Sequence, residues 1–449
     1  MTDVGWLPPG SPRVRQPLTE LGVQGFKSIH RRSSIRIGGL TILAGANSSG
    51  KSSHIQPLLL MKQTLEAQFD PGALLLEGPN LSVTSADQVL ARPSSTSAVS
   101  NFSLTAGFSD DTAVTLSYER EQRSGFRIRE MVVNRGGTTA QYREGMRLVA
   151  DSLPPDARLL GEALRRASKS PENLALSWTA VRNRCFLVPV AVVDGAFAPT
   201  ALPNDVPEHL SAQIQSLIHL PGLRGNPERT YRTTAIRATF PGTFEPYVAS
   251  LIMAWQRQRD DRIGLVAQDL RMLGLTGTIE AKAVDDTRVE LRVGRTPTAG
   301  PGAENDLVSI ADVGFGVSQT LPVIVALHAA VPGQLVYIEQ PEIHLHPRAQ
   351  TRLAGLLVNA VNQGVVVVVE THSSLLLRGI QTAIARAELD PTDVALHWFS
   401  RHRDGTTEVT TADLAEDGSF GDWPTDFDDI ALESDRDYLD AAERRLAGE

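Results

Sequence analysis

The sequence is poor in the features of secreted and membrane proteins. Among its 449 residues the only cysteine is Cys185, so the chain cannot close a disulfide on itself. It has no leader-like pattern, and no apolar run approaches the roughly 18 residues that a membrane-spanning helix needs. The longest apolar block, Val365 to Val369, has the length of a buried β-strand. These absences predict a cytoplasmic protein without disulfides or membrane segments.

Common catalytic signatures are missing as well. The chain contains no G-x-S-x-G, no H-E-x-x-H and no paired cysteines, and it shows neither an internal repeat nor sustained heptads. Its composition, with 41% hydrophobic and 21% charged residues, is that of an ordinary globular protein. The length allows two or three domains with a substantial core.

Charge is distributed unevenly along the chain. The net charge is -9. Residues 412–449 contain thirteen acidic and three basic residues, so this tail accounts for the whole excess of negative charge. The remainder is near neutral and has basic clusters, namely Arg31, Arg32 and Arg36, and then Arg224, Arg229, Arg232 and Arg237. Either cluster could contact phosphates, although a solvated charged face is the commoner explanation.

Periodicity and composition predict five segments. Residues 1–17 form a flexible arm, 18–90 and 286–411 read as two pieces of one α/β unit, 91–285 as an insertion, and 412–449 as an acidic tail. In the insertion, antiparallel strands from about residue 100 to 135 precede a mainly helical part. Because apolar strands alternate with helices in the two outer pieces, the sheet there is expected to be mostly parallel.

The strongest motif is GANSSGKS at residues 45–52, which fits the phosphate-binding pattern G-x-x-x-x-G-K-[ST]. Glycines let such a loop turn so that its N–H groups and the next helix N-terminus face phosphates. Lys51 is expected on the β- and γ-phosphates and the Ser52 hydroxyl on Mg²⁺. The residues expected to bind nucleotide here are Gly45, Asn47, Ser48, Ser49, Gly50, Lys51, Ser52 and Ser53.

Two later strands end in polar residues that fit the same site. In QLVYIEQPEIHLHP a buried strand ends in Glu339, whose carboxylate is expected to reach Mg²⁺ as the Walker B acid. In VVVVVETHS, Thr371 and His372 follow a second buried strand, and the carboxyl ends of parallel strands form the ligand edge of such a sheet. His372 is therefore expected to sense the γ-phosphate, with a satisfied polar residue as the alternative.

A glycine-rich turn, ADVGFGVSQTLPVI, opens a helix about 25 residues before Glu339. Along the chain, the P-loop is followed by this turn, then by the strand that ends in Glu339, and then by the strand before Thr371 and His372. These four elements in this order resemble the ATP-binding-cassette ATPases of the chromosome-maintenance and recombination group. The similarity is strongest to the compact AAA branch related to the overcoming-lysogenization-defect proteins, some of whose members serve in anti-phage defence. VQGFKSI near the start and EDGSFGDWPTDF near the end also resemble that branch, over roughly residues 18–90 and 285–430.

The resemblance implies an α/β, P-loop cassette-type head with a mostly parallel sheet, split by a mixed α+β insertion. It also implies a homodimer closed around two ATP molecules with Mg²⁺, in which Gly314, Gly316 and Ser318 of one copy face the γ-phosphate held by the other. The segment from His344 to Pro347 would lie at the dimer seam. Relatives with a C-terminal nuclease need more than the 77 residues that follow His372, so Asp435 and Asp437 read as a solvated helix face.

Two departures from the family pattern bear on hydrolysis. Gln340 stands where cassette ATPases usually carry the glutamate that polarises the attacking water. An amide cannot accept a proton, so general-base assistance is missing and hydrolysis is expected to be slow, unless Glu342 or His372 substitutes. Gly314 stands where the usual signature has serine. A metal site of Glu342, His344 and His346 is an alternative, although no further ligand is evident.

These observations predict an ATPase that switches a separate effector protein, with a nuclease as one candidate and a role in defence against phage or foreign DNA. Two alternatives stay open. One is a non-hydrolysing, ATP-dependent scaffold whose acidic tail docks a basic partner. The other is a repair ATPase that remodels DNA ends directly, with fast, DNA-stimulated turnover.

Overall fold

The structure is a computed structural model that describes residues 17–92, 99–122, 125–149, 153, 155–167, 175–193, 196–201, 205–296 and 306–421. The expected arm, apart from Pro17, and the acidic tail beyond Gly421 lie outside these residues, as do Asp435 and Asp437. Within the described part of the chain, no helix combines the length and the apolar character that crossing a bilayer requires.

A six-stranded sheet forms the centre of the molecule, in the order β12-β17-β18-β3-β19-β20. The strands are β12 (Ile218–Leu220), β17 (Leu335–Glu339), β18 (Val366–Thr371), β3 (Leu40–Gly45), β19 (Val394–Arg401) and β20 (Thr407–Ala412). The first five are parallel to one another, and β20 pairs antiparallel with β19. This confirms the mostly parallel sheet expected of a P-loop cassette-type fold.

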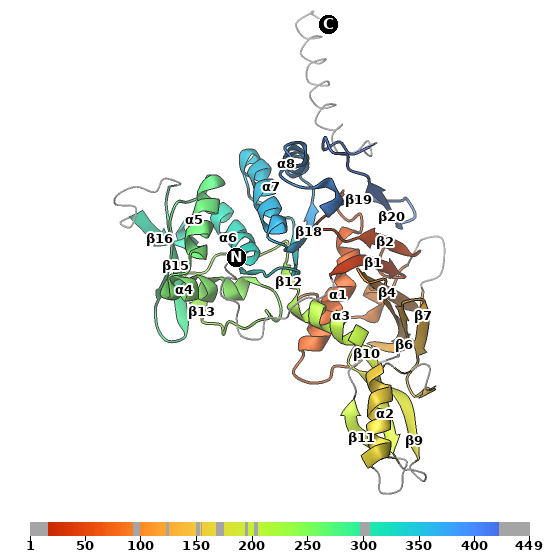
Figure 1. Cartoon of the computed structure of the whole chain (residues 1–449). Coiled ribbons are helices and arrows are strands. Elements are labelled where there is room, and N and C mark those ends of the chain that lie inside the picture. The colour runs from red at the N-terminus through yellow and green to blue at the C-terminus, as the bar shows by residue number, and fades with distance from the viewer. Residues whose placement is uncertain are drawn as a thin grey trace, which may run out of the picture.

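Helices cover both faces of this sheet because its strands are apolar on both sides. In β3, for example, Leu40 and Ile42 pack into one hydrophobic cluster and Leu43 into the other. The first cluster contains α4 (Val248–Gln258), α5 (Arg262–Met272), α6 (Phe315–Ala329), α7 (Pro347–Asn362) and α8 (Ser374–Ala385). Beside them lies a small antiparallel sheet of β13 (Tyr231–Arg232), β14 (Ile279–Ala283), β15 (Arg288–Gly294) and β16 (Leu307–Ser309) (Figure 1).

The second face carries α1 (Lys51–Glu66) and α3 (Asp205–Ser216), together with an antiparallel sheet in the order β2-β1-β4-β5-β6-β7. Its strands are β1 (Leu18–Gln24), β2 (Ser33–Arg36), β4 (Asn101–Phe108), β5 (Ala113–Glu121), β6 (Gly125–Arg135) and β7 (Thr138–Tyr142). The alternating burial of β4 and β5 agrees with the antiparallel strands expected from about residue 100 to 135.

The middle of the chain contains more strand than its sequence indicated. Besides α2 (Pro155–Ala167), it forms a sheet of β8 (Arg147–Leu148), β9 (Leu176–Asn183), β10 (Phe186–Val193) and β11 (Ala196–Ala201), seen at the lower right of Figure 1. The left-handed backbone of Arg184, with φ 52°, turns β9 directly into β10. Further along, β12 leaves this region and joins the edge of the central sheet. The segment boundaries remain a prediction.

The chain continues past β20 along α8. Leu414 forms a bridge with Phe420, whose side chain is buried, and Gln381 Nε2 donates to Gly418 O at 3.1 Å. The described beginning of the acidic segment is therefore packed against the head.

Candidate functional site

The P-loop lies between β3 and α1, and two of its residues must be glycine. Gly45 has φ 144° and Gly50 has φ 105°, values that side chains rarely tolerate. A Cβ on Gly45 would lie 2.3 Å from Phe399 O, and one on Gly50 would lie 2.3 Å from Thr407 Oγ1. The loop is thus shaped by close contact with the β19–β20 hairpin as well as by its own turns.

The same hairpin holds the loop from one side. Thr407 Oγ1 lies 2.7 Å from Ser49 O, and Arg401 Nη1 donates to Ser48 O at 3.0 Å. Ser49 is buried, whereas Asn47 and Ser48 are exposed. The exposed side of the loop is therefore open to a ligand while its other side is fixed.

Lys51 is the first residue of α1, and its ammonium group is folded back over the loop. Nζ donates to Gly45 O at 3.0 Å and to Ala46 O at 2.8 Å. Burial lowers the pKa of Lys51, while the charges of Glu370 and Glu342 raise it. Among the described residues no carboxylate is hydrogen-bonded to this ammonium group, so its positive charge remains available to an anion.

The carboxylate that contacts the P-loop serine is Glu370. Ser52 Oγ donates to Glu370 Oε2 at 2.9 Å, and the Tyr337 hydroxyl bonds the other oxygen. The sequence analysis expected Ser52 and Glu339 to bind the same Mg²⁺ and did not single out Glu370. Topology explains the difference, because β18 lies between β17 and β3, with Glu370 opposite both Glu339 and Leu43. The available signal was the acid that directly precedes Thr371 and His372.

Glu339 is nevertheless held close by. Its Oε1 lies 3.2 Å from His219 Nε2, and its Oε2 accepts from Gly222 N–H at 3.1 Å. His219 on β12 stacks on Tyr337, and its Nδ1 is 3.1 Å from Asn80 Oδ1. These contacts fix the carboxylate, and neither His219 nor Asn80 was singled out from the sequence because nothing local marks them.

The two neighbouring acids have pKa values shifted in opposite directions. Burial and the charge of Glu339 raise the pKa of Glu370 to about 7, against the opposing effects of Tyr337, Ser52 and Lys51. Burial acts to raise the pKa of Glu339 too, but its bonds to His219 and Gly222 lower it overall. Two carboxylates this close repel each other when both are ionised, so a cation between them would be favourable.

This arrangement fits Mg²⁺ better than a metal held by protein alone. No group of three or more histidines, cysteines, aspartates or glutamates able to bind a metal occurs in the described residues. Mg²⁺ is usually bound through one or two carboxylates together with substrate phosphates. Two buried oxygens, Ser49 Oγ and Glu342 Oε2, have no hydrogen-bond partner among the residues that the structure describes, which leaves polar capacity at the site.

The remaining expected catalytic residues surround this pair. Gln340 has φ 45°, and its N–H donates to Glu370 O at 2.9 Å. Glu342 Oε1 accepts from Thr371 Oγ1 and from His372 N–H, both at 2.8 Å. Burial and the charge of Lys51 lower the pKa of His372, although a backbone hydrogen bond with Gly45 opposes this. Glu339, Gln340, Glu342 and His372 are therefore brought to the P-loop edge of the sheet.

The glycine-rich turn lies elsewhere. Gly314 caps α6 and is exposed, as is Phe315, while Ser318 is buried and its Oγ donates to Phe315 O at 3.1 Å. Within the described residues, no hydrogen bond joins this turn to the P-loop of the same chain. His344, whose ring centroid is 5.6 Å from that of Phe315, is exposed.

The alternative metal site is not assembled. His344 and His346 are exposed, and His346 caps α7 by accepting from Arg348 N–H at 3.4 Å. Glu342 is instead buried against Thr371 and His372. The three side chains therefore serve different parts of the structure.

The second basic cluster is not a phosphate-binding surface as a whole. Arg224 is only 7% exposed, and Arg229 pairs with Asp312 at 2.8 Å. Arg31 and Arg32 of the first cluster are exposed, while Arg36 Nη1 donates to Thr392 O at 3.0 Å. Burial removes Arg224 from any contact with DNA.

Comparison with solved structures finds chains that resemble this one over most of its length. Solved structures similar to the chain include the Smc head domain with a coiled coil and joint from Pyrococcus yayanosii, at 11% identity and TM-score 0.45, covering 90% of this chain and 98% of that chain. Another is the Smc head bound to the C-winged helix domain of ScpA, at 15% identity and TM-score 0.44, covering 89% and 98%. The Smc head from Thermotoga maritima matches at 13% identity and TM-score 0.39, covering 88% and 98%. No curated protein matches the chain.

One protein family matches the chain over residues 40–378, which is more than half of its length and includes every motif of the site. That family is described as "AAA domain, putative AbiEii toxin, Type IV TA system". The match begins with β3, just before the P-loop, and includes the ends of β17 and β18. The chain belongs to this family of AAA domains.

Proposed function

We propose that the protein is a cassette-type ATPase that binds ATP with Mg²⁺ and thereby closes a homodimer. The observation that carries this proposal is the meeting of Lys51, Ser52, Glu339 and Glu370 at one edge of the sheet, with an open loop beside them. Bound Mg²⁺ would neutralise charge on the β- and γ-phosphates. Lys51 would exchange its loop carbonyls for phosphate oxygens, and Ser52 would exchange Glu370 for the metal.

A second copy completes the site in this proposal. The signature residues Gly314, Gly316 and Ser318 lie on α6, where they have no hydrogen bond to their own P-loop in the described part of the chain. Main-chain N–H groups at a helix start suit the γ-phosphate of a nucleotide held by another molecule, and Gly314 at this start is exposed. The expected product is a dimer with two ATP molecules between the copies.

Slow hydrolysis is part of the proposal. Gln340 takes the position of the usual base and has no group that accepts a proton. ATP then acts mainly as a ligand that fastens the two copies, and hydrolysis releases them.

A second candidate mechanism has one observation in its favour. Glu342 Oε2 is buried and has no hydrogen-bond partner in the described part of the chain, while Oε1 is fixed by Thr371 and His372. A carboxylate held in this way could accept the proton of the attacking water. Turnover of Gln340→Glu and Glu342→Gln decides between the two. Faster turnover in the first variant supports the missing base, whereas loss of turnover only in the second assigns the role to Glu342.

The dimer is proposed to switch a separate effector protein in defence against phage or foreign DNA. The description of the family as a toxin of a toxin–antitoxin system supports a defence role. A nuclease is one candidate effector, and the exposed Arg31 and Arg32 are candidates for contact with DNA. The test is ATP turnover with and without DNA. Strong stimulation of turnover by DNA would instead favour the DNA-remodelling alternative. A stable ATP-bound dimer without any turnover would favour the scaffold.

A further inference from the structure

The loop after β12 joins the Glu339 end of β17 to the first turns of α6. Arg224 Nη2 donates to Glu339 O at 2.6 Å, and Arg224 Nη1 donates to Gln319 O at 3.2 Å. Gln319 Nε2 in turn donates to Gly225 O at 2.7 Å, and Gly222 N–H donates to the Glu339 carboxylate. We call these four hydrogen bonds the Arg224 bridge. It connects the proposed metal site to the helix that carries the signature turn.

Arg224 is charged, and a charged side chain is unusual at a buried position where it would only fill space. Its side chain is buried, and its donors reach main-chain carbonyls although three carboxylates, Glu245, Glu342 and Glu339, are close enough to act on its charge. Burying a charge costs free energy unless its hydrogen bonds compensate, and charge-assisted bonds are roughly twice as strong as neutral ones. Arg224 therefore fixes the two carbonyls relative to each other.

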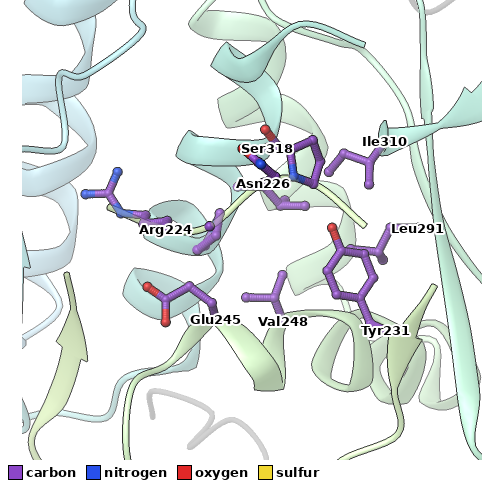
Figure 2. Close-up of a pocket in the computed structure, with 12 residues that line it drawn as sticks. Arg224, Asn226, Tyr231, Glu245, Val248, Leu291, Ile310 and Ser318 are labelled. Carbon is purple, nitrogen blue, oxygen red and sulfur yellow. The ribbon is translucent and has the colours of Figure 1, made fainter. Parts of the chain in front are cut away.

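The α6 side of the bridge borders a small pocket. A pocket of about 40 Å³ lies beside it, and Figure 2 shows Arg224 and Glu245 on one side of this pocket with Tyr231 and Leu291 on the other. Arg224 Nε and Glu245 Oε1 are buried and have no hydrogen-bond partner within the described ranges. Pro322 has no N–H, so it cannot bond the carbonyl of Ser318, which also lines the pocket.

We propose that Arg224 is a positioning residue that transmits the state of the Glu339–Gln340 turn to the signature turn of the same copy. This inference rests on the proposed ATP-dependent dimer. The Glu339 carboxylate would help to hold Mg²⁺. A change in the position of Glu339 would move its carbonyl with the strand end, and Arg224 would pass that shift on to Gln319. The start of α6 then takes the position in which Gly314 and Gly316 meet the nucleotide of the second copy.

The bridge makes the two nucleotides of the dimer interdependent. Because coupling between binding sites is reciprocal, contact of the signature turn with the second copy must also favour the loaded state of Glu339. Loading of one site and closure of the dimer are therefore expected to be cooperative, with Arg224 as the connection.

The experiment uses the full chain with Arg224→Met, which keeps the apolar stem and removes the donors, and Arg224→Lys, which keeps the charge. Arg184→Met is the matched control, since Arg184 also donates to a main-chain carbonyl, that of Thr64, away from the site. The measurements are the affinity of the monomer for a fluorescent ATP analogue, the dissociation constant of the ATP-bound dimer, and kcat and KM for ATP.

We expect Arg224→Met to bind the analogue within about threefold of wild type while the dimer weakens and kcat falls, each by at least about tenfold. KM should change little, Arg224→Lys should recover part of the loss, and the control should behave as wild type. Equal loss of nucleotide affinity and dimerisation in both Arg224 variants would overturn the inference, because it would show a purely structural arginine. Wild-type dimerisation and kcat in Arg224→Met would also overturn it.

A second variant covers the case in which Arg224→Met does not fold. Gln319→Met removes only the bond to Gly225, and it should weaken the dimer in the same direction without loss of analogue binding. The outcome is separable from failure of the proposed function. If wild type itself does not dimerise with ATP and Mg²⁺, the proposed function fails, whereas a wild-type dimer with unchanged Gln319→Met and Arg224 variants contradicts only the bridge.

Discussion

At the scale of single residues, the central feature is the buried carboxylate of Glu370 between Ser52 and Tyr337. The raised pKa of about 7 means that the folded state prefers the protonated acid, whereas the unfolded chain ionises it near 4.5. Its contribution to stability is therefore fully present below about pH 4.5 and is lost as pH rises to about 7. Mg²⁺ at the site would supply the missing positive charge.

The first prediction concerns Glu370→Gln in the absence of nucleotide. Glutamine keeps hydrogen bonds to Ser52 and Tyr337 without the charge, so the variant should gain stability over wild type as pH rises. Its advantage in free energy of unfolding should be about 2 kcal/mol larger at pH 8 than at pH 5. Denaturant titration at both pH values checks this. If the difference in free energy of unfolding between the two proteins were independent of pH, the pKa of Glu370 would not be raised in the folded state.

A second residue-scale prediction concerns His54, which is fully buried in α1. Burial lowers its pKa from 6.5 to about 3, so between these pH values the unfolded chain binds a proton that the folded protein does not bind. Stability is therefore present above pH 6.5 and falls as pH decreases toward 3. Wild type should lose about 2 kcal/mol more than His54→Leu between pH 7 and pH 5. Parallel loss in both proteins would place the acid sensitivity elsewhere.

At the scale of elements, the P-loop depends on the β19–β20 hairpin packed against it. Gly45→Ala would push a Cβ into Phe399 O and force an alanine to φ 144°. We expect nucleotide binding to be lost and the free energy of unfolding to fall by about 1 to 3 kcal/mol. Thermal unfolding and nucleotide titration measure both effects.

The control for this prediction is Gly355→Ala in the middle of α7, where an added Cβ meets no atom within 4 Å. Helix propensity should then raise stability by roughly 0.5–1 kcal/mol, without effect on nucleotide binding. Equal behaviour of the two variants would contradict the close approach of β19 to the loop.

The elements near the motifs were predictable from the sequence. The strand, loop and helix around Gly45 to Ser53, and the buried strands before Glu339 and His372, follow from apolar runs and glycine placement. The sequence did not identify His219, Asn80 and Glu370 as site residues, because their role depends on which strands become neighbours. Pairing of β12 with β17 brings His219 to Glu339, and this pairing joins residues that are far apart in sequence.

At the scale of the whole molecule, the described chain combines a nucleotide edge and a signature turn that do not meet within one copy. The hydrophobic clusters on the two faces of the sheet hold both in one head. The Arg224 bridge links them through Glu339 and Gln319. In the proposed dimer, a second copy brings its signature turn to this nucleotide edge.

The measurement that tests this account most directly is the mass of the full chain in solution with ATP and Mg²⁺, for wild type beside Lys51→Ala. Lys51 has no directly bonded carboxylate, so its loss should remove phosphate binding and not the fold. The account predicts that wild type shifts from monomer to dimer only with ATP and Mg²⁺, and that Lys51→Ala remains a monomer at the same concentrations. A mass independent of nucleotide in wild type, or a dimer of Lys51→Ala with ATP, would contradict it.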